Sequence, residues 1–447
     1  MSLFGSLFSG VSGLNAQSRA MSMISDNVAN VNTTAFKGAD VQFASLVTRQ
    51  RGAVSTYSPG GVRAQSHYTV TSQGLIQSSA SPTDAAISGA GFFVVNTLPR
   101  GDGEQLYTRA GSFEPDFEGK LRTASGQYLQ GWALDADEKV ADVNRLETVN
   151  IRRINGFAVA TTTVEVGANL DADEAPYAGA YAAGDMAAWQ ASGGASGVKP
   201  SFTRPVQIYD SLGRAHDVTL AFLRTGAANS WAVELCADPA AVDATVHADG
   251  LLASGTVTFS GTGTLASADL TPVVSGTAGT PVEIRWARPD GADPSRITFD
   301  FGTIGGTDGL SQFASPTNVA FVRQNGAPVG ELNGAAIDEN GFVVASFTNG
   351  ETRRLYQLPI ATFANPSGLD PRSGNVFGQT DVSGEFNLRL PGRGGAGTIT
   401  PSALESANVD LAEEFTKMIV TQRAYSANAK VINAADQMLD ELIRVAG

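Results

Sequence analysis

The sequence predicts a mixed, mainly β protein. N- and C-terminal α-helices are expected to form a coiled-coil-like pair, with two nested antiparallel β domains of sandwich or barrel type between them. Two observations predict this fold. Apolar residues recur every seven positions at both ends of the 447-residue chain, which keeps one face of each helix turned toward a partner. The region between the ends is rich in glycine and consists of short alternating runs separated by turns, which is typical of strands with one wet face.

The first helix is expected over residues 3–31. Gly5, Gly10 and Gly13 each lower its intrinsic helix propensity by about 1 kcal/mol relative to Ala, so this helix should need partners to be stable. Two heptad series run along it. They are Leu7, Leu14, Met21 and Val28, with Gly10, Gln17, Ile24 and Val31 beside them.

The last helix is expected over residues 405–447. Asn408 and Asp410 lie near its start, where a polar side chain can cap the free N–H groups and an acidic one complements the helix dipole. Two paired helices bury only a narrow stripe, so further copies of the chain are expected to complete the packing. The heptad series here are Leu411, Met418, Tyr425, Ile432 and Leu439, with Phe415, Gln422, Ala429, Asp436 and Ile443 beside them.

The region between the helices is expected to hold one β domain inserted into another. The hairpin signal at residues 337–345 resembles the one at residues 113–121, so both flanks of the chain should build one inner domain. We expect residues 39–65 to be extended or irregular, residues 171–200 to be a long loop, and residues 391–400 to be a flexible return. The predicted division is 1–31 and 405–447 for the helical domain, 32–70 and 392–404 for an extended connecting region, 71–155 and 325–391 for the inner β domain, and 156–324 for the outer β domain.

Composition excludes several classes of function. The formal charge is −14 and the isoelectric point about 4.7, which argues against nucleic acid and against insertion into an anionic membrane surface. Residues 157–323 carry much of the excess, with 17 acidic and 8 basic residues. No apolar run approaches the roughly 18 residues that span a bilayer. The single cysteine, Cys236, lies in an apolar run and is expected to be a buried small hydrophobe.

The sequence offers no convincing catalytic or cofactor site. The motifs of serine hydrolases, nucleotide-binding loops, thiol redox centres and zinc proteases are absent. His67, His216 and His247 lie far apart, and His216 is expected in a solvated loop. Acidic clusters at residues 135–137 and 171–174 lack the layout of a calcium-binding loop. We therefore expect a protein that is not an enzyme and that holds no cofactor or metal.

Two terminal segments carry recognisable motifs: residues 25–38, Ser-Asp-Asn-Val-Ala-Asn-Val-Asn-Thr-Thr-Ala-Phe-Lys-Gly, and residues 405–415 with 419–432. They resemble the N-terminal and C-terminal signatures of the flagellar rod and hook family. Residues 87–95, 107–113 and 126–132 resemble the domain that hook and distal rod proteins share. Residues 206–220 resemble the outer domain of the hook branch, whereas distal rod proteins are shorter and lack that domain.

The resemblance implies a structural subunit of the bacterial flagellar hook. Such subunits polymerise into a short, curved, flexible tube, a universal joint that transmits torque from rod to filament during motility. It also implies an extracellular location in the flagellum, export through a type III apparatus without a cleaved signal peptide, and contacts with rod, hook-cap and hook–filament junction proteins. Two alternatives remain open at this point: a distal rod-type axial protein, and a β-rich surface adhesin outside the flagellum.

Two sets of residues follow from this comparison. The expected subunit-packing residues are Leu7, Leu14, Met21, Ile24, Val28, Val31, Leu411, Phe415, Met418, Tyr425, Ile432 and Leu439. The residues that match the family signature are Asn27, Asn30, Asn32, Thr33, Phe36, Lys37, Asn408, Asp410, Gln422 and Arg423. The family usually has Gly where this chain has Ala35, which raises the question whether residue 35 still adopts the positive φ that Gly adopts freely.

Overall fold

The computed structural model describes residues 3–47, 59–288 and 291–446. It divides into two compact units. Unit 1 comprises Met1–Arg153, Asn333–Ser346 and Thr352–Gly447, and unit 2 comprises Ile154–Leu332 and Phe347–Glu351. Strands dominate both units, and the long helices belong to unit 1 at the two ends of the chain. The predicted fold class is therefore confirmed, with one β region nested inside another.

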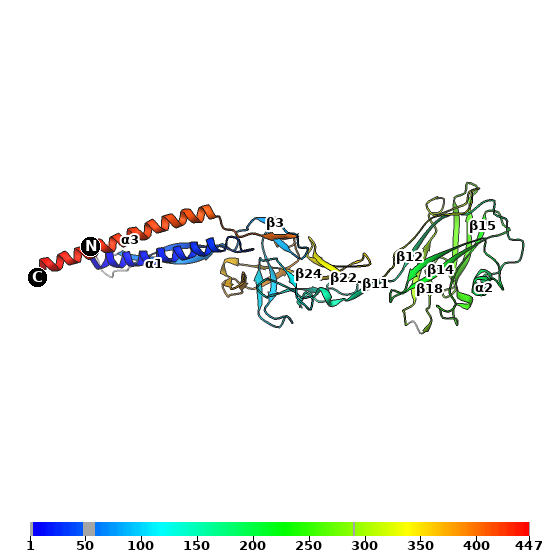
Figure 1. The fold of residues 1–447 in the computed structure, drawn as a ribbon, viewed down its shortest axis with the longest axis horizontal. Helices are drawn as coiled ribbons and strands as arrows, with labels where there is room; N and C mark the ends of the chain where they lie inside the picture. The colour runs from blue at the N-terminus through cyan, green and yellow to red at the C-terminus, as the bar shows by residue number, and fades with distance from the viewer. Residues whose placement is uncertain (1–2, 48–58, 289–290, 447) are drawn as a thin grey trace. The chain divides into compact units, whose positions relative to one another are not determined.

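The two long helices of unit 1 lie side by side, as Figure 1 shows. Helix α1 spans Leu3–Ala29 and helix α3 spans Leu411–Ala446. Gly10 lies against Ile432, whereas Asn27 contacts Glu414, so the two helices are antiparallel. Helix α3 begins six residues later than expected, because Ala403–Glu405 form strand β30 and pair with strand β3, Ile76–Ser78.

A β-hairpin follows helix α1. Strands β1, Ala39–Val47, and β2, Pro59–Tyr68, pair antiparallel with Ala39 opposite Tyr68. The backbone N–H of Val62 donates to the Ser12 hydroxyl of α1 over 3.2 Å, which fixes the hairpin on the helix. The expectation of an irregular segment over residues 39–65 is therefore wrong for the described residues; positions 48–58 lie outside them. Phe43 on β1 is half exposed. Because this strand is not buried, its sequence lacks the apolar alternation by which strands are recognised.

The β part of unit 1 is built from both flanks of the insertion. Its core contains Phe92, Tyr107 and Phe377, and the Phe92 ring meets the Phe377 ring edge-on at 5.8 Å. The strands are β4 Ala85–Ser88, β5 Phe92–Asn96, β6 Gln105–Thr108, β7 Glu114–Pro115, β8 Leu121–Arg122, β9 Tyr128–Ala133, β10 Glu147–Thr148, β23 Phe342–Phe347, β24 Thr352–Gln357, β25 Ile360–Phe363, β26 Asp370–Arg372, β27 Val376–Gly378, β28 Phe386–Arg389 and β29 Thr398–Pro401. Strand β22, Ala327–Ile337, is divided between the units.

The segment expected as a flexible return is a paired strand in part. Residues 398–401 form β29, which pairs antiparallel with β4, so that Ile399 lies opposite Ile87. Both of these side chains are buried. The glycines at 392–397 suggested flexibility, but the pairing partner lies more than 300 residues away and leaves no local signal.

Most of unit 2 is formed by two sheets that pack over a shared core, whereas its strand β11 pairs with β22. One sheet has the strand order β13-β14-β15-β16-β17 and is antiparallel throughout. In the other, β12 runs antiparallel to β21 but parallel to β19 and β20, so the prediction of purely antiparallel pairing fails there. Trp231 is fully buried in the core. The strands are β11 Gly156–Val159, β12 Thr163–Asn169, β13 Phe202–Tyr209, β14 Ala215–Arg224, β15 Ser230–Ala237, β16 Leu251–Phe259, β17 Leu265–Pro272, β18 Val282–Ile284, β19 Ser295–Asp300, β20 Leu310–Ser311 and β21 Asn318–Gln324.

Residues 171–200 are not merely a loop. They contain helix α2, Asp185–Ala191, whose Met186 is fully buried against Leu223 on β14 and Ala232 on β15. The buried carboxylate of Glu234 on β15 accepts from the Tyr181 hydroxyl at 2.7 Å and from the backbone N–H groups of Gly184 and Ala187 at 2.7 and 2.8 Å. Glu234 lies 47–53 residues downstream of the groups that it binds. The local composition of residues 171–200 therefore could not reveal that this segment is bound to the sheet.

Candidate assembly surface

The contact between α1 and α3 is made by small residues on α1. A Cβ added at Gly10 would lie 2.9 Å from the Ile432 side chain, and one added at Gly13 would lie 2.8 Å from the Asn428 side chain. Both glycines therefore permit a close approach that larger residues would prevent. Two of the three glycines that weaken the isolated helix, Gly10 and Gly13, are therefore also the ones that fit it to α3. The buried positions among the described side chains of α1 are Gly10, Gly13, Ala16, Ala20, Ile24 and Asn27.

One of the two heptad series predicted to face a partner helix differs by one position from the residues that contact α3. Gly10 contacts Ile432 as expected for one series, but Gly13 and Asn27 also contact α3, and they lie one position before Leu14 and Val28. The reason is steric, because the helix axes approach most closely over the smallest side chains. Of the predicted packing residues, only Ile24 is fully buried. Leu7, Leu14, Met21, Val28, Val31, Met418, Ile432 and Leu439 are half-buried, and Leu411, Phe415 and Tyr425 are exposed.

The end of α1 is held by a signature asparagine. The Asn27 amide nitrogen donates to the Ala39 carbonyl at 3.0 Å and to Glu414 of α3 at 3.1 Å, and its oxygen accepts from the Ala39 N–H at 3.0 Å. Asn27 and Glu414 are both buried. One side chain thus joins α1, the hairpin and α3, a role that the sequence did not indicate.

A second signature residue forms a buried ion cluster. The Lys37 amine donates to Glu405 at 2.5 Å, and Arg109 lies 3.4 Å from the other Glu405 oxygen. Glu405 is fully buried and also accepts from the Gly74 N–H at 2.8 Å. Burial lowers the pKa of both Lys37 and Arg109, although the Glu405 carboxylate works against that shift. The cluster connects the segment after α1 with strand β30, which precedes α3.

The signature residues at the start of α3 have separate roles. Asp410 caps the helix, because its carboxylate accepts from the N–H of Ala412 at 2.8 Å and of Glu413 at 3.3 Å. Asn408 does not cap; its amide donates to the Thr69 carbonyl at 3.0 Å and accepts from the Gly38 N–H at 2.8 Å. The two alternatives for the cap are thereby resolved in favour of Asp410.

The turn after α1 keeps the conformation that Gly would adopt. Ala35 has φ 56° and is buried, and its N–H donates to the Glu405 carbonyl at 2.7 Å. The surrounding contacts therefore hold a left-handed conformation that Ala adopts only at a cost in free energy.

The other signature residues close the helix end or face solvent. The Asn30 amide donates to the Asp26 carbonyl at 2.9 Å, and the Thr33 hydroxyl donates to Asn30 at 3.2 Å. The Phe36 side chain is half-buried. Asn32, Gln422 and Arg423 are exposed.

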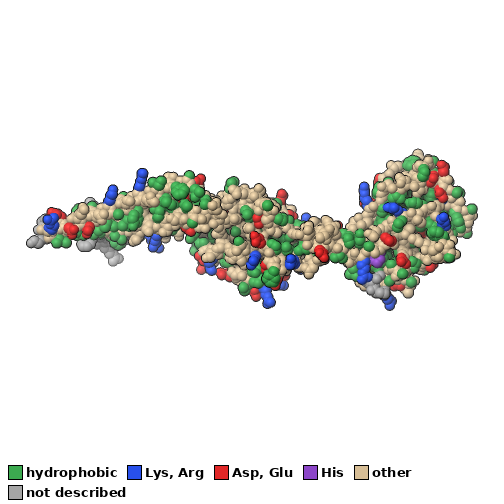
Figure 2. Space-filling model, in the orientation of Figure 1, with side chains coloured by type: hydrophobic (Ala, Val, Ile, Leu, Met, Phe, Trp, Pro, Cys, Tyr) green, Lys and Arg blue, Asp and Glu red, His purple; other side chains and the backbone are tan. Residues whose placement is uncertain are grey.

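Helix α3 leaves many large apolar side chains in solvent. A helix in a completed fold turns its apolar face to the core and leaves polar residues outside. Here Phe415 is 50% and Ile419 52% exposed. Hydrophobic side chains are visible along the helical end of the molecule in Figure 2. Such exposed apolar surface marks an interaction site. The exposed apolar residues of α3 are Leu411, Phe415, Ile419, Val420, Tyr425, Val431, Met438 and Ile443.

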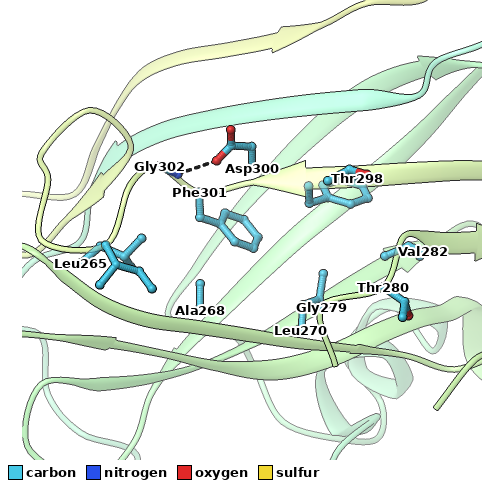
Figure 3. Close-up of a pocket in the computed structure, with 12 residues that line it drawn as sticks. Leu265, Ala268, Leu270, Gly279, Thr280, Val282, Thr298, Asp300, Phe301 and Gly302 are labelled. Atoms are coloured by element: carbon cyan, nitrogen blue, oxygen red, sulfur yellow. Dashed lines mark hydrogen bonds between the residues drawn. The ribbon is translucent and has the colours of Figure 1, made fainter. Parts of the chain in front are cut away.

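A cavity of about 230 Å³ in unit 2 lacks the features of a catalytic site. It lies between β17 and β19, with Leu265, Leu270, Val282 and Phe301 in its walls (Figure 3). The one carboxylate among its lining residues, Asp300, accepts from the Gly302 N–H at 2.9 Å. The cavity therefore holds no group of side chains that could perform acid–base chemistry on a ligand.

The titratable groups expected to be inert have structural roles among the described residues. Cys236 is buried, and burial raises the pKa of its thiol to about 12. The prediction that His216 lies in a solvated loop is wrong, because the pairing of β13 with β14 places this residue on a strand. One nitrogen of its ring lies 2.9 Å from Asp210, and the ring stacks on the Trp286 ring at a centroid distance of 3.8 Å. Asp135 and Asp171 accept backbone N–H groups in their own turns. Among the described residues, no group of three or more His, Cys, Asp or Glu could hold a metal, and no helix could span a membrane.

Comparison with known proteins explains this arrangement of helices and β units. Over its whole length the chain is 32% identical to the flagellar hook protein FlgE of Caulobacter vibrioides and 34% identical to that of Rhizobium meliloti, and it covers all of both relatives. The chain belongs to the flagellar hook protein family. The hook protein of Escherichia coli is 29% identical over 97% of this chain and 98% of its own length.

Family models for the separate domains match in the same order. The flagellar basal body rod protein model matches residues 7–37, and the C-terminal model of the rod proteins matches residues 400–445. The D1 domain model of flagellar hook proteins matches residues 86–169, and the basal body FlaE D2 domain model matches residues 199–327. The full-length matches to hook proteins overturn the two alternatives, a distal rod-type protein and a non-flagellar adhesin.

Among solved structures, the Helicobacter pylori flagellar hook protein FlgE2 is similar with a TM-score of 0.45 and 16% identity, covering 74% of this chain and all of that chain. Membership of the hook family rests on the full-length relatives and the domain models.

Proposed function

We propose that this chain polymerises through its terminal helices into the curved tube of the bacterial flagellar hook, where it transmits torque from rod to filament. The observation that carries this proposal is the apolar face that α3 leaves uncovered in a chain whose relatives are hook proteins over their full length. Each large apolar side chain that a neighbour covers completely is worth about 1.5–3 kcal/mol. Several such side chains per copy therefore favour a polymer strongly.

The predicted packing residues fit this role as a set. Leu7, Leu14, Met21 and Val28 are only half-buried by the helices and hairpin of their own chain, and Phe415 is half exposed. We infer that neighbouring copies cover what remains. The four-part division of the chain, with its helical, connecting, inner and outer parts, belongs to the same proposal.

The remaining inferences concern partners and location. We infer that the rod lies at one end of the polymer, that the hook cap and junction proteins occupy the other, and that the chain reaches the outside through the type III export apparatus. The weak intrinsic helicity of α1 suits a segment that stays unfolded until it assembles. We expect no enzymatic activity and no cofactor.

The test is assembly of the purified full-length chain under salting-out conditions, viewed by negative-stain electron microscopy. We expect tubes or curved fibres from the wild-type chain and none from Phe415→Asp, because a carboxylate would be buried at the contact. Phe117→Asp is the matched control, since Phe117 is 85% exposed on the β part of unit 1. Fibres from Phe415→Asp equal to those of the wild type would place the assembly contacts elsewhere, and a wild-type chain that never assembles would refute the proposal.

A further inference from the structure

The exposed apolar side chains of α3 include one regular ridge. Leu411, Phe415 and Ile419 follow each other at intervals of four residues, and all three are exposed by 41–52%. Residues four apart form a continuous ridge on a helix surface, and such ridges pack into the grooves of neighbouring elements. The next residue in this series is Arg423, which is exposed and has no ion pair among the described residues. The ridge therefore ends in an unpaired positive charge.

A groove of matching character lies beside α3. It has a volume of about 510 Å³ and is bounded by α1, strand β1 and α3. Met23, Ile24, Val41 and Phe43 supply apolar walls. Phe43 is 50% exposed, so the groove is not filled by its own chain.

The rim of this groove carries excess negative charge. Three carboxylates surround the single Lys417 amine: Asp40 at 3.0 Å, Glu413 at 3.0 Å and Glu414 at 2.9 Å. Burial works to lower the pKa of Lys417, but the hydrogen bonds to these carboxylates outweigh it and raise that pKa. Glu414 is also bound by Asn27, whereas the Glu413 side chain is 66% exposed. Glu413 is thus the carboxylate best placed to accept a further cation.

The ridge cannot reach the groove of its own chain. Glu413 and Lys417 each lie two residues from Phe415, and residues two apart on an α-helix point about 200° apart around its axis. Ridge and groove are therefore on opposite sides of α3. A contact between them joins two different surfaces of two copies, so it leaves a free ridge and a free groove at the ends and repeats without closing on itself unless the rotation between copies forms a ring.

We propose that the groove between α1, β1 and α3 receives the ridge Leu411-Phe415-Ile419 of a second copy of this chain, with Arg423 of that copy facing Glu413. The inference rests on the proposed polymer and names a specific contact within it. The occupant is this chain itself because both the apolar spacing and the charge that the groove requires are present on α3.

The experiment measures the critical concentration for assembly of full-length chains by sedimentation, in a neutral osmolyte such as trimethylamine N-oxide, which favours burial without screening charge. We expect Arg423→Glu to raise the critical concentration at least about tenfold, because like charges then face each other. Arg423→Glu combined with Glu413→Arg should restore assembly to within about threefold of wild type. Arg122→Glu is the control, because Arg122 is also exposed and has no ion pair among the described residues, but lies on β8 of the inner β part.

Each outcome decides between the proposals. The proposed contact would be overturned if Arg423→Glu assembled at the same critical concentration as the wild type. It would also be overturned if the double variant had folded helices by circular dichroism but failed to recover assembly. Either result would leave the proposed polymer standing. Absence of assembly by the wild-type chain would overturn both.

Discussion

The terminal helices of unit 1 and the sheets of unit 2 differ in how far their large apolar side chains are buried. In unit 2, Trp231, Leu220 and Phe222 are at most 1% exposed between two sheets. On α3, Phe415, Ile419 and Val420 are at least half exposed. Unit 2 buries its large side chains by itself, whereas α3 exposes many of its own and packs against α1 where α1 has Gly10 and Gly13. Burial of large side chains within one chain and exposure of such side chains thus occur in different parts of the molecule.

The sharpest test of this contrast is to truncate one large side chain in each region. Trp231→Ala should lower the free energy of unfolding of unit 2 by about 3–5 kcal/mol, through lost burial and the cavity left behind. Phe415→Ala should change the stability of the unassembled chain by less than about 0.5 kcal/mol, because its ring is already half solvated. Both changes in stability can be measured by urea unfolding of each variant, with hydrogen exchange of β14 and α3 peptides used to report on the two regions separately. Comparable losses in the two variants would contradict the contrast.

A second test concerns the ion cluster that ties the helical end to the β part of unit 1. Glu405→Ala would leave Lys37 and Arg109 buried without a counter-charge, and removal of one partner from such a cluster costs about 3–5 kcal/mol. We expect faster hydrogen exchange in β4 and β30. Glu118→Ala, which breaks an exposed pair with Lys120, is the control and should cost less than about 1 kcal/mol. Equal effects would mean that Glu405 acts only by its volume.

The close approach of α1 to α3 can be tested at Gly10. Gly10→Val would place atoms against Ile432, whose side chain lies 2.9 Å from an added Cβ, and overpacking of this kind costs about 1–3 kcal/mol. Thermal unfolding of the helices, followed by circular dichroism at low concentration, should show the loss. Ser25→Val on the exposed side of α1 is the control. A stabilised Gly10→Val variant would show that the helices are not packed this closely.

The smallest expected effect is a pH dependence confined to unit 2. His247 is buried; one ring nitrogen lies 3.0 Å from the Leu251 carbonyl and the other accepts from the Arg285 N–H at 3.1 Å. Burial lowers the pKa of His247. The unfolded chain therefore binds a proton first as pH falls below about 6.5, and stability declines by at most about 1.4 kcal/mol per pH unit from there toward the lowered pKa.

Urea midpoints measured between pH 5 and 8 test this dependence. His247→Gln should flatten the profile, whereas replacement of the exposed His67 should not. An unchanged slope in His247→Gln would assign the titration to another group.

The sequence predicted the terminal helices, the nested β regions and the signature residues, because heptads, alternation and local motifs leave local patterns. It did not predict which heptad line faces the partner, since hydrophobicity favoured Leu14 and Met21 over Gly13 and Ala20. Nor did it predict helix α2, which depends on an acceptor at Glu234, or the pairing of Lys37 with Glu405 across 368 positions. Features that depend on distant partners leave no trace in a local window.

The link between Lys37 and Glu405 also governs the order in which the chain can fold. Lys37 and Glu405 lie 368 positions apart, so their pairing closes a loop of almost the entire chain. Contacts between such distant positions form late because the loop between them must close first. Unit 2 does not include Lys37 or Glu405, so we expect it to fold without this closure. A chain cut short before Glu405 would leave Lys37 without its counter-charge, so under the proposed assembly we expect such a copy to fit poorly into the polymer.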